Sequence, residues 1–296
     1  MYLNLIAIKE LTASQIIDIF RLADQLHHFK GSKPLKGKTF ALFFPESSLR
    51  TRITFEKGIK ELGGKSILFP PESLDKKEEL EDVIQYMENW VDGVIVRHSD
   101  TTTVQELAKY TSIPIINAMT AHNHPCEILS DLYAISKIRK NYRELTYTFI
   151  GPVSNIARSW MEIAHVMNLD YQHVCKKGCE LAGATSNYKF DTNLEVALAS
   201  SDIVLTDSLP ADFRTVEYIN TYQITLARMK LAKPNALLNP CPPFFRNEEV
   251  SEEVISSEYF VGYEFKNSLI TVQQAIILKC MGITASEILL KLALYK

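Results

Sequence analysis

The chain alternates short apolar runs with longer amphipathic stretches over most of its length, and this pattern restricts the folds it can adopt. In the first half, four apolar runs have the length of buried strands: Phe40–Phe44, Ser66–Phe69, Gly93–Val96 and Pro114–Asn117. Three stretches with helical spacing lie between them: Arg50–Leu62, Glu79–Trp90 and Thr103–Tyr110. Such alternation predicts parallel strands joined by crossover helices, which is an α/β fold.

A second series of the same kind starts near Leu145. Its expected strands are Tyr147–Ile150, Asp170–Val174, Asp202–Thr206 and Asn235–Leu238. A helix is expected at Asn155–Met167, between the first two of these strands. A helix at Pro125–Arg139 would bridge the two series, and Thr271–Tyr295 is helical by its apolar spacing, with Gly282 as the expected position of a break. We therefore predict two domains, each a parallel sheet flanked by helices, over residues 1–133 and 134–274, with a C-terminal helix at about 275–296 completing the first. A ligand site is expected in the interdomain cleft, beyond the carboxyl ends of the strands.

Composition excludes several classes of protein. Hydrophobic residues make up 46% of the 296 residues and charged residues 23%, which fits a globular protein, and the net charge of −3 lacks the basic excess that nucleic acid requires. The five scattered cysteines indicate reduced thiols in a cytoplasmic protein, and no signal peptide or membrane span is expected. A nucleotide-binding oxidoreductase is disfavoured because no Gly-x-Gly-x-x-Gly follows a strand.

Two basic motifs stand where expected strands end. Ser48-Leu49-Arg50-Thr51-Arg52 follows the first strand and opens a helix, whose free N–H groups and dipole suit an anion. Arg97 ends the third strand and would reach the same rim. Taken alone, Ser48 could simply cap the helix. Together, the arginines and hydroxyls indicate a site for a small phosphate compound.

A third motif, His124 to Asp131, begins a helix at the same rim. A histidine beside proline is most often structural, but a neutral imidazole at a helix start can donate a hydrogen bond to a carbonyl oxygen. Glu127 could simply favour the positive helix end, or it could accept hydrogen bonds from an NH2 group of a ligand.

These motifs resemble those of the aspartate/ornithine carbamoyltransferase family. The segment Ser48–Arg52 is similar to the family's Ser-Thr-Arg-Thr-Arg, His124–Asp131 to its His-Pro-x-Gln-x-Leu-x-Asp, and Arg97 to its phosphate-binding arginine. The resemblance extends over essentially the whole chain and is strongest in residues 38–135. It implies that an amine attacks the carbamoyl carbon of carbamoyl phosphate and that phosphate leaves, with no metal and no cofactor.

The resemblance also implies roles for individual residues. Ser48, the Leu49 backbone N–H, Arg50, Thr51 and Arg97 would bind the phosphate. The oxyanion on the carbamoyl oxygen would be stabilised by Arg50, Thr51 and His124, which would be the catalytic residues. Glu127 and the Cys241 carbonyl would hold the carbamoyl NH2 group. Family members are trimers, so a homotrimer or a multiple of trimers is expected here, with Ser73 and Lys76 lent by a neighbouring subunit. The alternative for the segment that contains these two residues is a charged surface loop.

The acceptor amine is expected in the second domain, where the resemblance favours the ornithine branch over the aspartate branch. Asn155, Asp207 and Ser208 would bind it, because Gly151–Ala157 and Thr206-Asp207 are similar to ornithine-branch motifs and an aspartate suits an ammonium group. The expected substrates are therefore carbamoyl phosphate and an ornithine-like amino acid or diamine.

Four positions depart from the family pattern: Leu49, Glu127, Asn239 and Pro243. Leu49 removes a hydroxyl, and Glu127 places a negative charge near a dianion, at a cost unless arginines balance it or it is protonated. An alternative is therefore a catalytically altered paralog that binds a phosphate metabolite or serves as a scaffold or regulatory subunit.

Three further features have structural interpretations. Thr12 to Gln15 predicts a capping box at the start of a helix. His173, Cys175 and Cys179 are too few ligands for a zinc site and predict core thiols. Trp90 and Trp160 are expected in the core.

Overall fold

The computed structural model describes residues 2–26, 31–183 and 185–288 of the chain. It divides into two compact units, the first formed by the chain up to Ala134 together with the chain from Lys266 onward, the second by residues Ile135–Phe265. Each unit is built on one parallel sheet, as the alternating pattern predicts. No helix in the described residues is both long and apolar enough to cross a bilayer.

The first unit contains a four-stranded sheet in the order β2-β1-β3-β4. Its strands are β1 (Thr39–Phe43), β2 (Lys65–Phe69), β3 (Gly93–Arg97) and β4 (Ile115–Met119). Every pair of neighbours is parallel. β1 and β3 lie at the centre and are almost completely buried, whereas β2 is an exposed edge strand. This explains why the apolar runs at 40–44 and 93–96 are the clearest strand signals.

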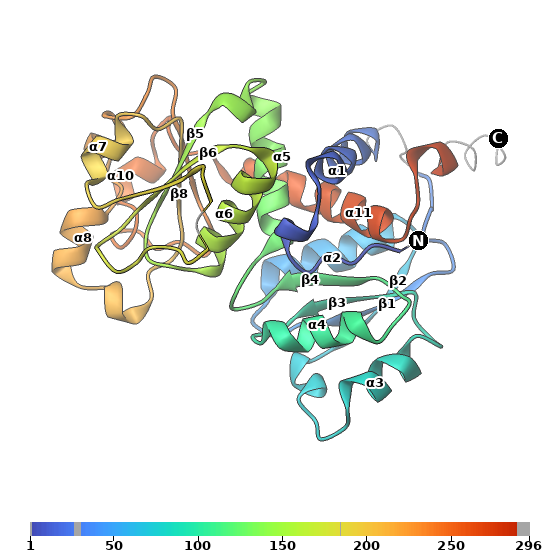
Figure 1. Cartoon of the computed structure of the whole chain (residues 1–296). Coiled ribbons are helices and arrows are strands. Elements are labelled where there is room, and N and C mark those ends of the chain that lie inside the picture. The colour runs from blue at the N-terminus through green and yellow to red at the C-terminus, as the bar shows by residue number, and fades with distance from the viewer. Residues whose placement is uncertain (1, 27–30, 184, 289–296) are drawn as a thin grey trace. The chain divides into compact units, whose positions relative to one another are not determined.

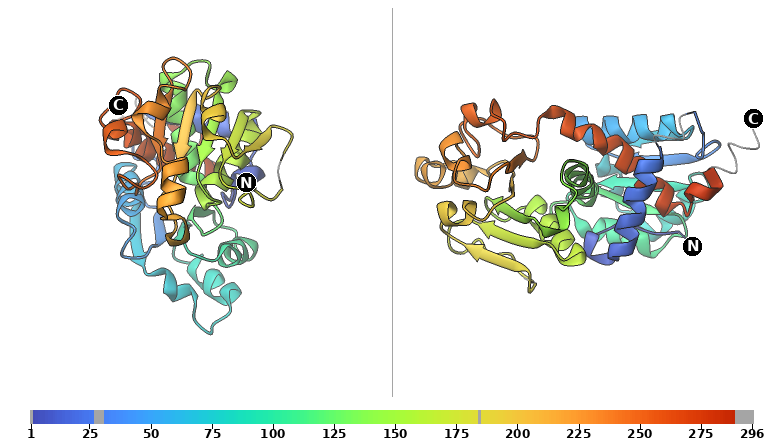
Figure 2. Two further views of the ribbon diagram at one scale, coloured as in Figure 1. Left: turned by 90° about the vertical axis from the view of Figure 1, so that its left-hand side faces the viewer. Right: turned by 90° about the horizontal axis from the view of Figure 1, so that it is seen from above.

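Helices cover both faces of this sheet (Figure 1). On one side lie α3 (Leu80–Met87) and α4 (Thr101–Lys109), and on the other α1 (Ala13–Leu26), α2 (Leu49–Glu61) and α11 (Ser268–Cys280). Although α11 comes from the far end of the chain, it packs between α1 and α2, as the right-hand view of Figure 2 shows. The predicted last helix, Thr271–Tyr295, is interrupted at the expected glycine: α11 ends at Cys280, Gly282 in the following turn has a positive φ, and residues 285–288 are helical again. Residues 289–296 lie outside the described residues.

The second unit contains a five-stranded parallel sheet in the order β7-β6-β5-β8-β9. Its strands are β5 (Thr146–Ile150), β6 (Asp170–Val174), β7 (Tyr188–Asp191), β8 (Ile203–Thr206) and β9 (Leu237–Pro240). Helix α6 (Asn155–Met167) lies on one face, while α7 (Leu194–Leu198), α8 (Val216–Tyr222) and α10 (Glu252–Ile255) lie on the other (Figure 1). A short α9 (Leu226–Met229) packs against α7 and α10. The remaining helix, α5 (Pro125–Ile138), contains the residue at which the first unit gives way to the second.

Short 3-10 turns complete the secondary structure, at Ile8–Glu10, Pro71–Leu74, Tyr142–Glu144, Ala211–Phe213 and Tyr263–Asn267. The predicted capping box at the start of α1 is confirmed, because the Thr12 N–H donates to Gln15 Oε1 (2.8 Å) and the Gln15 N–H to Thr12 Oγ1 (3.2 Å).

The prediction for the two tryptophans is half right. Trp160 is buried in the core of the second unit, but the core position predicted for Trp90 is wrong, since its exposed fraction is 71%. The reason is the end of α3 at Met87. The Asn89 side chain donates to the Gln85 and Tyr86 carbonyls, the helix stops there, and Trp90 therefore falls in the following turn instead of on the apolar stripe.

Candidate active site

The first candidate residues lie at the carboxyl edge of β1 and β3, where the connections from these neighbouring strands run in opposite directions. β1 leads into α2 on one face of the sheet, and β3 leads into α4 on the other. Such a switch point is the usual ligand site of an open parallel sheet. Ser48 precedes the first turn of α2, and Arg97 is the last residue of β3.

Arg97 contacts the start of α2 directly. Its Nη1 atom donates to Ser48 Oγ (3.0 Å) and to Thr51 Oγ1 (3.4 Å). Ser48 makes no side-chain capping hydrogen bond to the helix, so its hydroxyl serves the arginine instead. Both hydroxyls are buried, whereas Arg50 and Leu49 are exposed. The Leu49 N–H, expected to bind phosphate, here donates to the Ser47 carbonyl (2.9 Å).

His124 stands directly before α5 and is buried. Burial, together with the positive charges of Arg97 and Lys266, lowers the pKa of His124 to about 4, against the opposing charge of Glu127. The imidazole is therefore neutral at pH 7, in the form that can donate to a carbonyl oxygen without carrying a charge.

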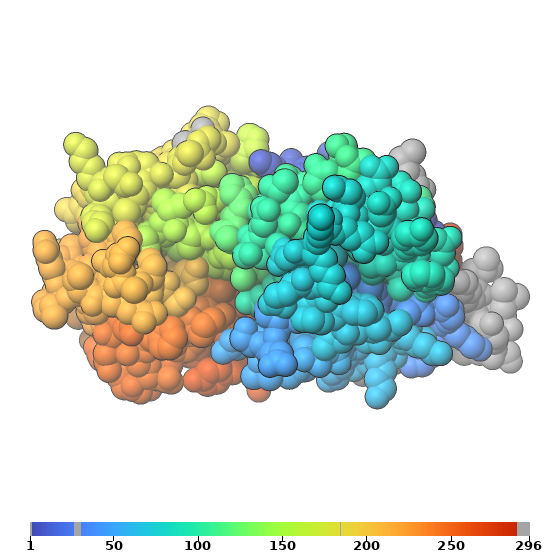
Figure 3. Space-filling model, turned by 90° about the horizontal axis from the view of Figure 1, so that it is seen from below, coloured from blue at the N-terminus to red at the C-terminus, as the bar shows by residue number. Residues whose placement is uncertain are grey.

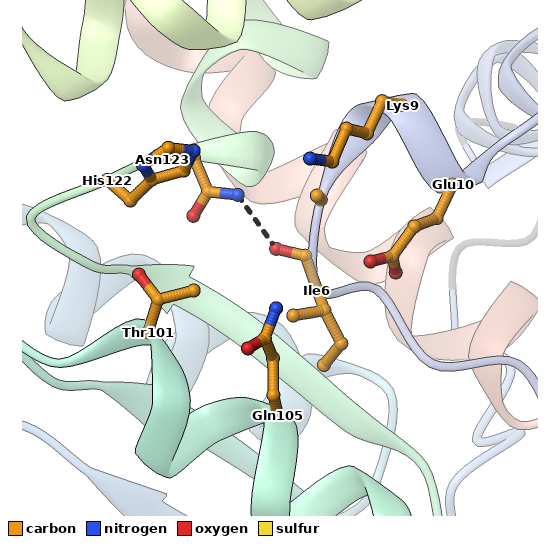
Figure 4. A pocket seen from close by; sticks show the side chains of 8 residues that line it. Ile6, Lys9, Glu10, Thr101, Gln105, His122 and Asn123 are labelled. Atoms are coloured by element: carbon orange, nitrogen blue, oxygen red, sulfur yellow. Dashed lines mark hydrogen bonds between the residues drawn. The ribbon is translucent and has the colours of Figure 1, made fainter.

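The loop before His124 is fixed by a network around Asn123. The Asn123 side chain accepts from Asn117 Nδ2 (2.6 Å) and Thr120 Oγ1 (3.0 Å), and it donates to the Ile6 carbonyl (3.1 Å). Figure 4 shows this last bond on the wall of a pocket of about 190 Å³. The pocket is lined by Ile6, Ala7, Lys9, Glu10, Thr101, Gln105, His122 and Asn123. None of these residues belongs to the predicted phosphate site, so this pocket is separate from it.

Glu127 lies in the first turn of α5, and Lys266 balances its charge. Lys266 Nζ lies 2.7 Å from Glu127 Oε1 and 2.6 Å from Asp131 Oδ1. Burial alone would raise the pKa of Glu127, but Lys266, with smaller contributions from His124 and Arg50, holds that pKa below its usual value. The carboxylate is therefore ionised. Because these shifts also depend on Arg50 and Arg97, the phosphate loop, His124 and Glu127 occupy one electrostatic environment.

Lys266 is the residue that the sequence interpretation missed, although a signal for it exists. Glu127 and Asp131 are four residues apart in a helix that is otherwise largely apolar, so both face the same way into a buried environment. Two buried carboxylates on one helix face require a cation. The sequence does not say which lysine or arginine supplies it, because 135 residues separate Asp131 from Lys266.

The loop predicted to serve a neighbouring subunit lies at the surface of the first unit. Ser73 belongs to a short 3-10 turn, and Lys76 is exposed. Asp75, which lies between these two residues in the sequence, forms a hydrogen bond with His98: its Oδ1 atom is 2.9 Å from His98 Nε2. Since His98 follows Arg97 directly, the loop is tied to the end of β3.

The acceptor candidates lie at the corresponding edge of the second sheet, where β5 and β8 are neighbours. Asn155 opens α6 after β5, with Ser154 capping that helix by accepting from the Ala157 N–H (3.1 Å). Asp207 and Ser208 follow β8, and the Ser208 N–H donates to Asp207 Oδ1 (2.9 Å). Cys241 follows β9, is buried, and donates its backbone N–H to the Thr206 carbonyl (2.9 Å). The second sheet thus brings these four residues to three adjacent strand ends.

This edge also carries a buried acid, Glu249, which the sequence interpretation did not single out. Its Oε1 accepts from the Phe245 N–H (2.5 Å). Burial raises the pKa of Glu249 to about 7, and the nearby charges of Glu248 and Asp207 add to the increase. Three carboxyl groups thus lie within electrostatic range of one another at this edge, in contrast to the arginines at the edge of the first sheet.

The remaining candidate cluster has ordinary partners. His173 contacts the Tyr188 hydroxyl (3.0 Å) and the Gly151 carbonyl (2.8 Å), while Cys175 contacts the Tyr218 hydroxyl (3.3 Å). Cys175 and Cys179 are buried free thiols, as expected. Within the described residues, no group of three or more His, Cys, Asp or Glu is arranged to hold a metal ion.

Comparisons with known proteins match both units. Residues 3–137 match the family model "Aspartate/ornithine carbamoyltransferase, carbamoyl-P binding domain", and residues 143–280 match "Aspartate/ornithine carbamoyltransferase, Asp/Orn binding domain". The chain is 32% identical to the ornithine carbamoyltransferase of Syntrophotalea carbinolica over 278 residues, covering 88% of this chain and 90% of that one. It is 30% identical to the Acinetobacter baylyi enzyme of the same name, covering 93% and 94%.

Solved structures give the same result. The ornithine carbamoyltransferase from Pyrococcus furiosus superposes with a TM-score of 0.87 at 25% identity, covering 94% of this chain and 97% of that one. The anabolic ornithine carbamoyltransferase from Campylobacter jejuni has a TM-score of 0.85 at 25% identity, covering 94% and 99%. The likeness therefore includes both sheets and the connections between their strands.

Proposed function

The chain belongs to the aspartate/ornithine carbamoyltransferase family, and from this premise we propose that it transfers the carbamoyl group of carbamoyl phosphate to an ornithine-like amino acid or diamine and releases phosphate. The first unit would bind carbamoyl phosphate, and the second would bind the amine. Relatives named ornithine carbamoyltransferase, matched over nearly their whole length, support this choice of acceptor.

The contact of Arg97 with Ser48 and Thr51 is the observation that carries the proposal. It brings a guanidinium group and two hydroxyls together at the start of α2, where the helix dipole also favours an anion. Ser48, Leu49 through its backbone, Arg50, Thr51 and Arg97 are proposed to bind the phosphate. The Leu49 N–H would have to exchange its bond to Ser47 for one to the ligand.

The proposed reaction needs stabilisation of one developing charge. When the amine attacks the carbamoyl carbon, negative charge grows on the carbamoyl oxygen, and the bond to phosphate then breaks. Arg50, Thr51 and neutral His124 are proposed as the donors to that oxygen. A fixed donor of this kind contributes about 3–4 kcal/mol to lowering the barrier in enzymes where one has been removed. Glu127 is proposed to accept from the carbamoyl NH2 group, and the Cys241 carbonyl is proposed as a further acceptor.

The acidic edge of the second sheet supports a cationic acceptor. Asp207 and Ser208 follow β8, Asn155 follows β5, and the buried Glu249 lies within electrostatic range of Asp207. A carboxylate binds an ammonium group, whereas a second carboxylate, as in aspartate, would be repelled. Asn155, Asp207 and Ser208 are therefore proposed to bind the α-amino acid or amine.

We propose a homotrimer in the cytoplasm, in which Ser73 and Lys76 contribute to a neighbouring subunit. Apolar side chains on the start of α2 and on the edge strand β2 support self-association: Leu49, Ile53, Ile67 and Phe69 are exposed. Figure 3 shows this part of the chain, in light blue and cyan, at the surface of the first unit. Interfaces between subunits bury apolar side chains of this kind. Sedimentation across a range of concentrations tests the assembly.

The experiment for the reaction is a colorimetric assay for ureido products with carbamoyl phosphate and a panel of amines. The panel contains ornithine, putrescine, 2,3-diaminopropionate, N-acylated ornithines and aspartate. We expect product with ornithine or a close analogue and none with aspartate. If no amine gives product although the chain binds phosphonoacetamide, the chain is the catalytically altered paralog instead.

A further inference from the structure

The ion cluster at the start of α5 combines an acidic residue at position 127 with a lysine from the C-terminal part of the first unit. Lys266 Nζ contacts both Glu127 Oε1 (2.7 Å) and Asp131 Oδ1 (2.6 Å). The exposed fractions of the three side chains are 21%, 7% and 2%. Glu127 lies one turn into the helix that His124 precedes, so the cluster adjoins the proposed catalytic imidazole.

We propose that Lys266 is a positioning residue which keeps Glu127 ionised, and that the ionised Glu127 makes the site select a carbamoyl group over a carboxyl group on the same phosphate scaffold. This inference rests on the proposed function, since it takes Glu127 as the partner of the carbamoyl NH2 group.

The selectivity follows from the donor and acceptor inventory of the side chains. An ionised carboxylate only accepts hydrogen bonds, and the NH2 group of a carbamoyl moiety only donates them. A ligand carboxylate at the same place would bring two like charges together in a buried site. A glutamine can turn its amide and offer either its oxygen or its NH2, so it discriminates less.

The dependence on Lys266 follows from burial. Burial of Glu127 favours its neutral form, and Lys266 makes the largest contribution in the opposite direction. Without the ammonium group, Glu127 and Asp131 would remain as two buried carboxyls on one face of α5. A proton would then bind to this pair at a higher pH, and a protonated Glu127 would offer the carbamoyl NH2 group only a neutral carbonyl oxygen, which is a weaker acceptor than the carboxylate.

The test measures binding of two stable ligands, phosphonoacetamide and phosphonoacetate, by titration calorimetry between pH 6 and pH 8. The first carries the amide of a carbamoyl group, and the second carries a carboxylate. We expect the wild-type chain to prefer the amide by at least about 10-fold, the size of one hydrogen bond to a charged group. In Glu127→Gln this preference should shrink toward equality, mainly because phosphonoacetate binds better.

Lys266→Met provides the readout that a merely structural role would not change. Relative to the wild-type chain at each pH, which removes the titration of the ligand itself, its affinity for phosphonoacetamide should fall by about 10-fold as the pH decreases from 8 to 6. The double variant Glu127→Gln/Lys266→Met should lose this pH dependence. Lys266→Arg keeps the charge and should restore affinity to within a few-fold.

Lys279→Met is the matched control. Lys279 also belongs to the C-terminal part of the first unit, and its Nζ lies 2.9 Å from Asp18 Oδ2, with a side chain 29% exposed. Lys279 on α11 and Asp18 on α1 form an ion pair of similar length. Loss of the Lys279 charge should therefore leave the preference for the amide ligand and the pH dependence of that preference unchanged.

Three outcomes would overturn the inference while leaving the proposed function in place: equal wild-type affinity for the two ligands, a wild-type pH profile in Lys266→Met, or the same acid sensitivity in the double variant as in Lys266→Met. If the wild-type chain bound no phosphonoacetamide, the proposed function would fail as well. If Lys266→Met did not fold, the loss of preference in Glu127→Gln and its retention in Lys266→Arg would decide the matter.

Discussion

The two sheets place their candidate residues at equivalent positions but prepare them differently. In the first unit, Arg97 donates to Ser48 and Thr51, and Lys266 donates to Glu127. In the second unit, Asp207 accepts from the neighbouring Ser208 N–H and lies near a buried acid, Glu249. The first edge combines arginines, hydroxyls and a carboxylate balanced by a lysine, and the second brings the carboxyl groups of Asp207, Glu248 and Glu249 within electrostatic range of one another. The arrangement in the first unit suits one particular substrate, carbamoyl phosphate. The carboxyl groups in the second unit select cationic acceptors as a class but do not distinguish one amine from another.

The largest effect is expected from Arg50→Ala in the basic edge. The change removes a phosphate contact and a donor to the oxyanion together, so kcat/KM for carbamoyl phosphate should fall by about 10³-fold or more. The ureido-product assay measures this. Arg21→Ala, which removes an exposed arginine paired with Asp18 on α1, is the control and should retain full activity. If Arg50→Ala kept wild-type turnover, the assignment of residues 48–52 as the phosphate-binding loop would be wrong, and the contrast between the two edges would no longer hold.

The next effect concerns His124 and pH. The pKa of His124 is lowered to about 4 in the folded chain, against about 6.5 when unfolded, so the unfolded chain binds one more proton between these values. The neutral His124 therefore contributes fully to the free energy of unfolding above pH 6.5. As the pH falls toward 4, the free energy of unfolding decreases by about 3 kcal/mol on account of this residue. His124→Asn should flatten this acid branch in denaturant titrations.

The exposed His165 on α6 serves as the control, and His165→Asn should leave the acid branch unchanged. If His124→Asn kept the full acid dependence, the imidazole would not be held neutral by its surroundings. The basic edge would then be less preorganised than the comparison requires.

Asp207→Asn sharpens the comparison from the acidic side. Loss of one charge that faces the acceptor should raise KM for an ornithine-like amine by about 10- to 100-fold, with KM for carbamoyl phosphate nearly unchanged. Steady-state kinetics with each substrate varied in turn separate the two values. Asp212→Asn, at an exposed position in the same unit, should change neither. An equal rise for both substrates would argue against a role confined to the acceptor.

The smallest effect is expected from the cap that positions Asn155. Ser154→Ala removes the side-chain acceptor for the Ala157 N–H and should reduce the stability of the chain by about 1 kcal/mol. Thermal unfolding measures it. Asp100→Ala, which removes the corresponding cap from α4 by losing the bond to the Thr102 N–H, gives the same test in the first unit. Only Ser154→Ala should also weaken the binding of the amine substrate, because Ser154 caps the helix that begins at Asn155.

Much of the fold could be predicted from hydrophobic patterning. Asn155–Met167 and Asp170–Val174 were predicted with the bounds that the structure has, because each is a strong run limited by polar or turn residues. β7 was not predicted, since Tyr188–Asp191 is a short edge strand that contains a lysine and an aspartate. Helices α7 to α10 are four to seven residues long, and their ends depend on local caps such as Asn193 and Thr215, which a pattern of apolar spacing does not detect.

The site followed the same division. The convergence of Ser48, Thr51 and Arg97 was predictable because parallel strands deliver their carboxyl ends to one edge. The cation for Glu127 was not, since nothing local identifies a partner 139 residues away. The exposure of Trp90 likewise depends on where α3 ends, which the Asn89 side chain decides.

The return of the chain to the first unit at Lys266 has a consequence for biosynthesis. Domains usually fold as they leave the ribosome, starting from the amino terminus. Here the nascent first unit must wait until nearly nine-tenths of the polypeptide has been translated before Lys266 can reach Glu127 and Asp131, and α11 emerges later still. Until then its two carboxyls lack their lysine, and α1 and α2 lack the helix that packs between them. Truncated translation products should therefore fold incompletely and be degraded readily by proteases.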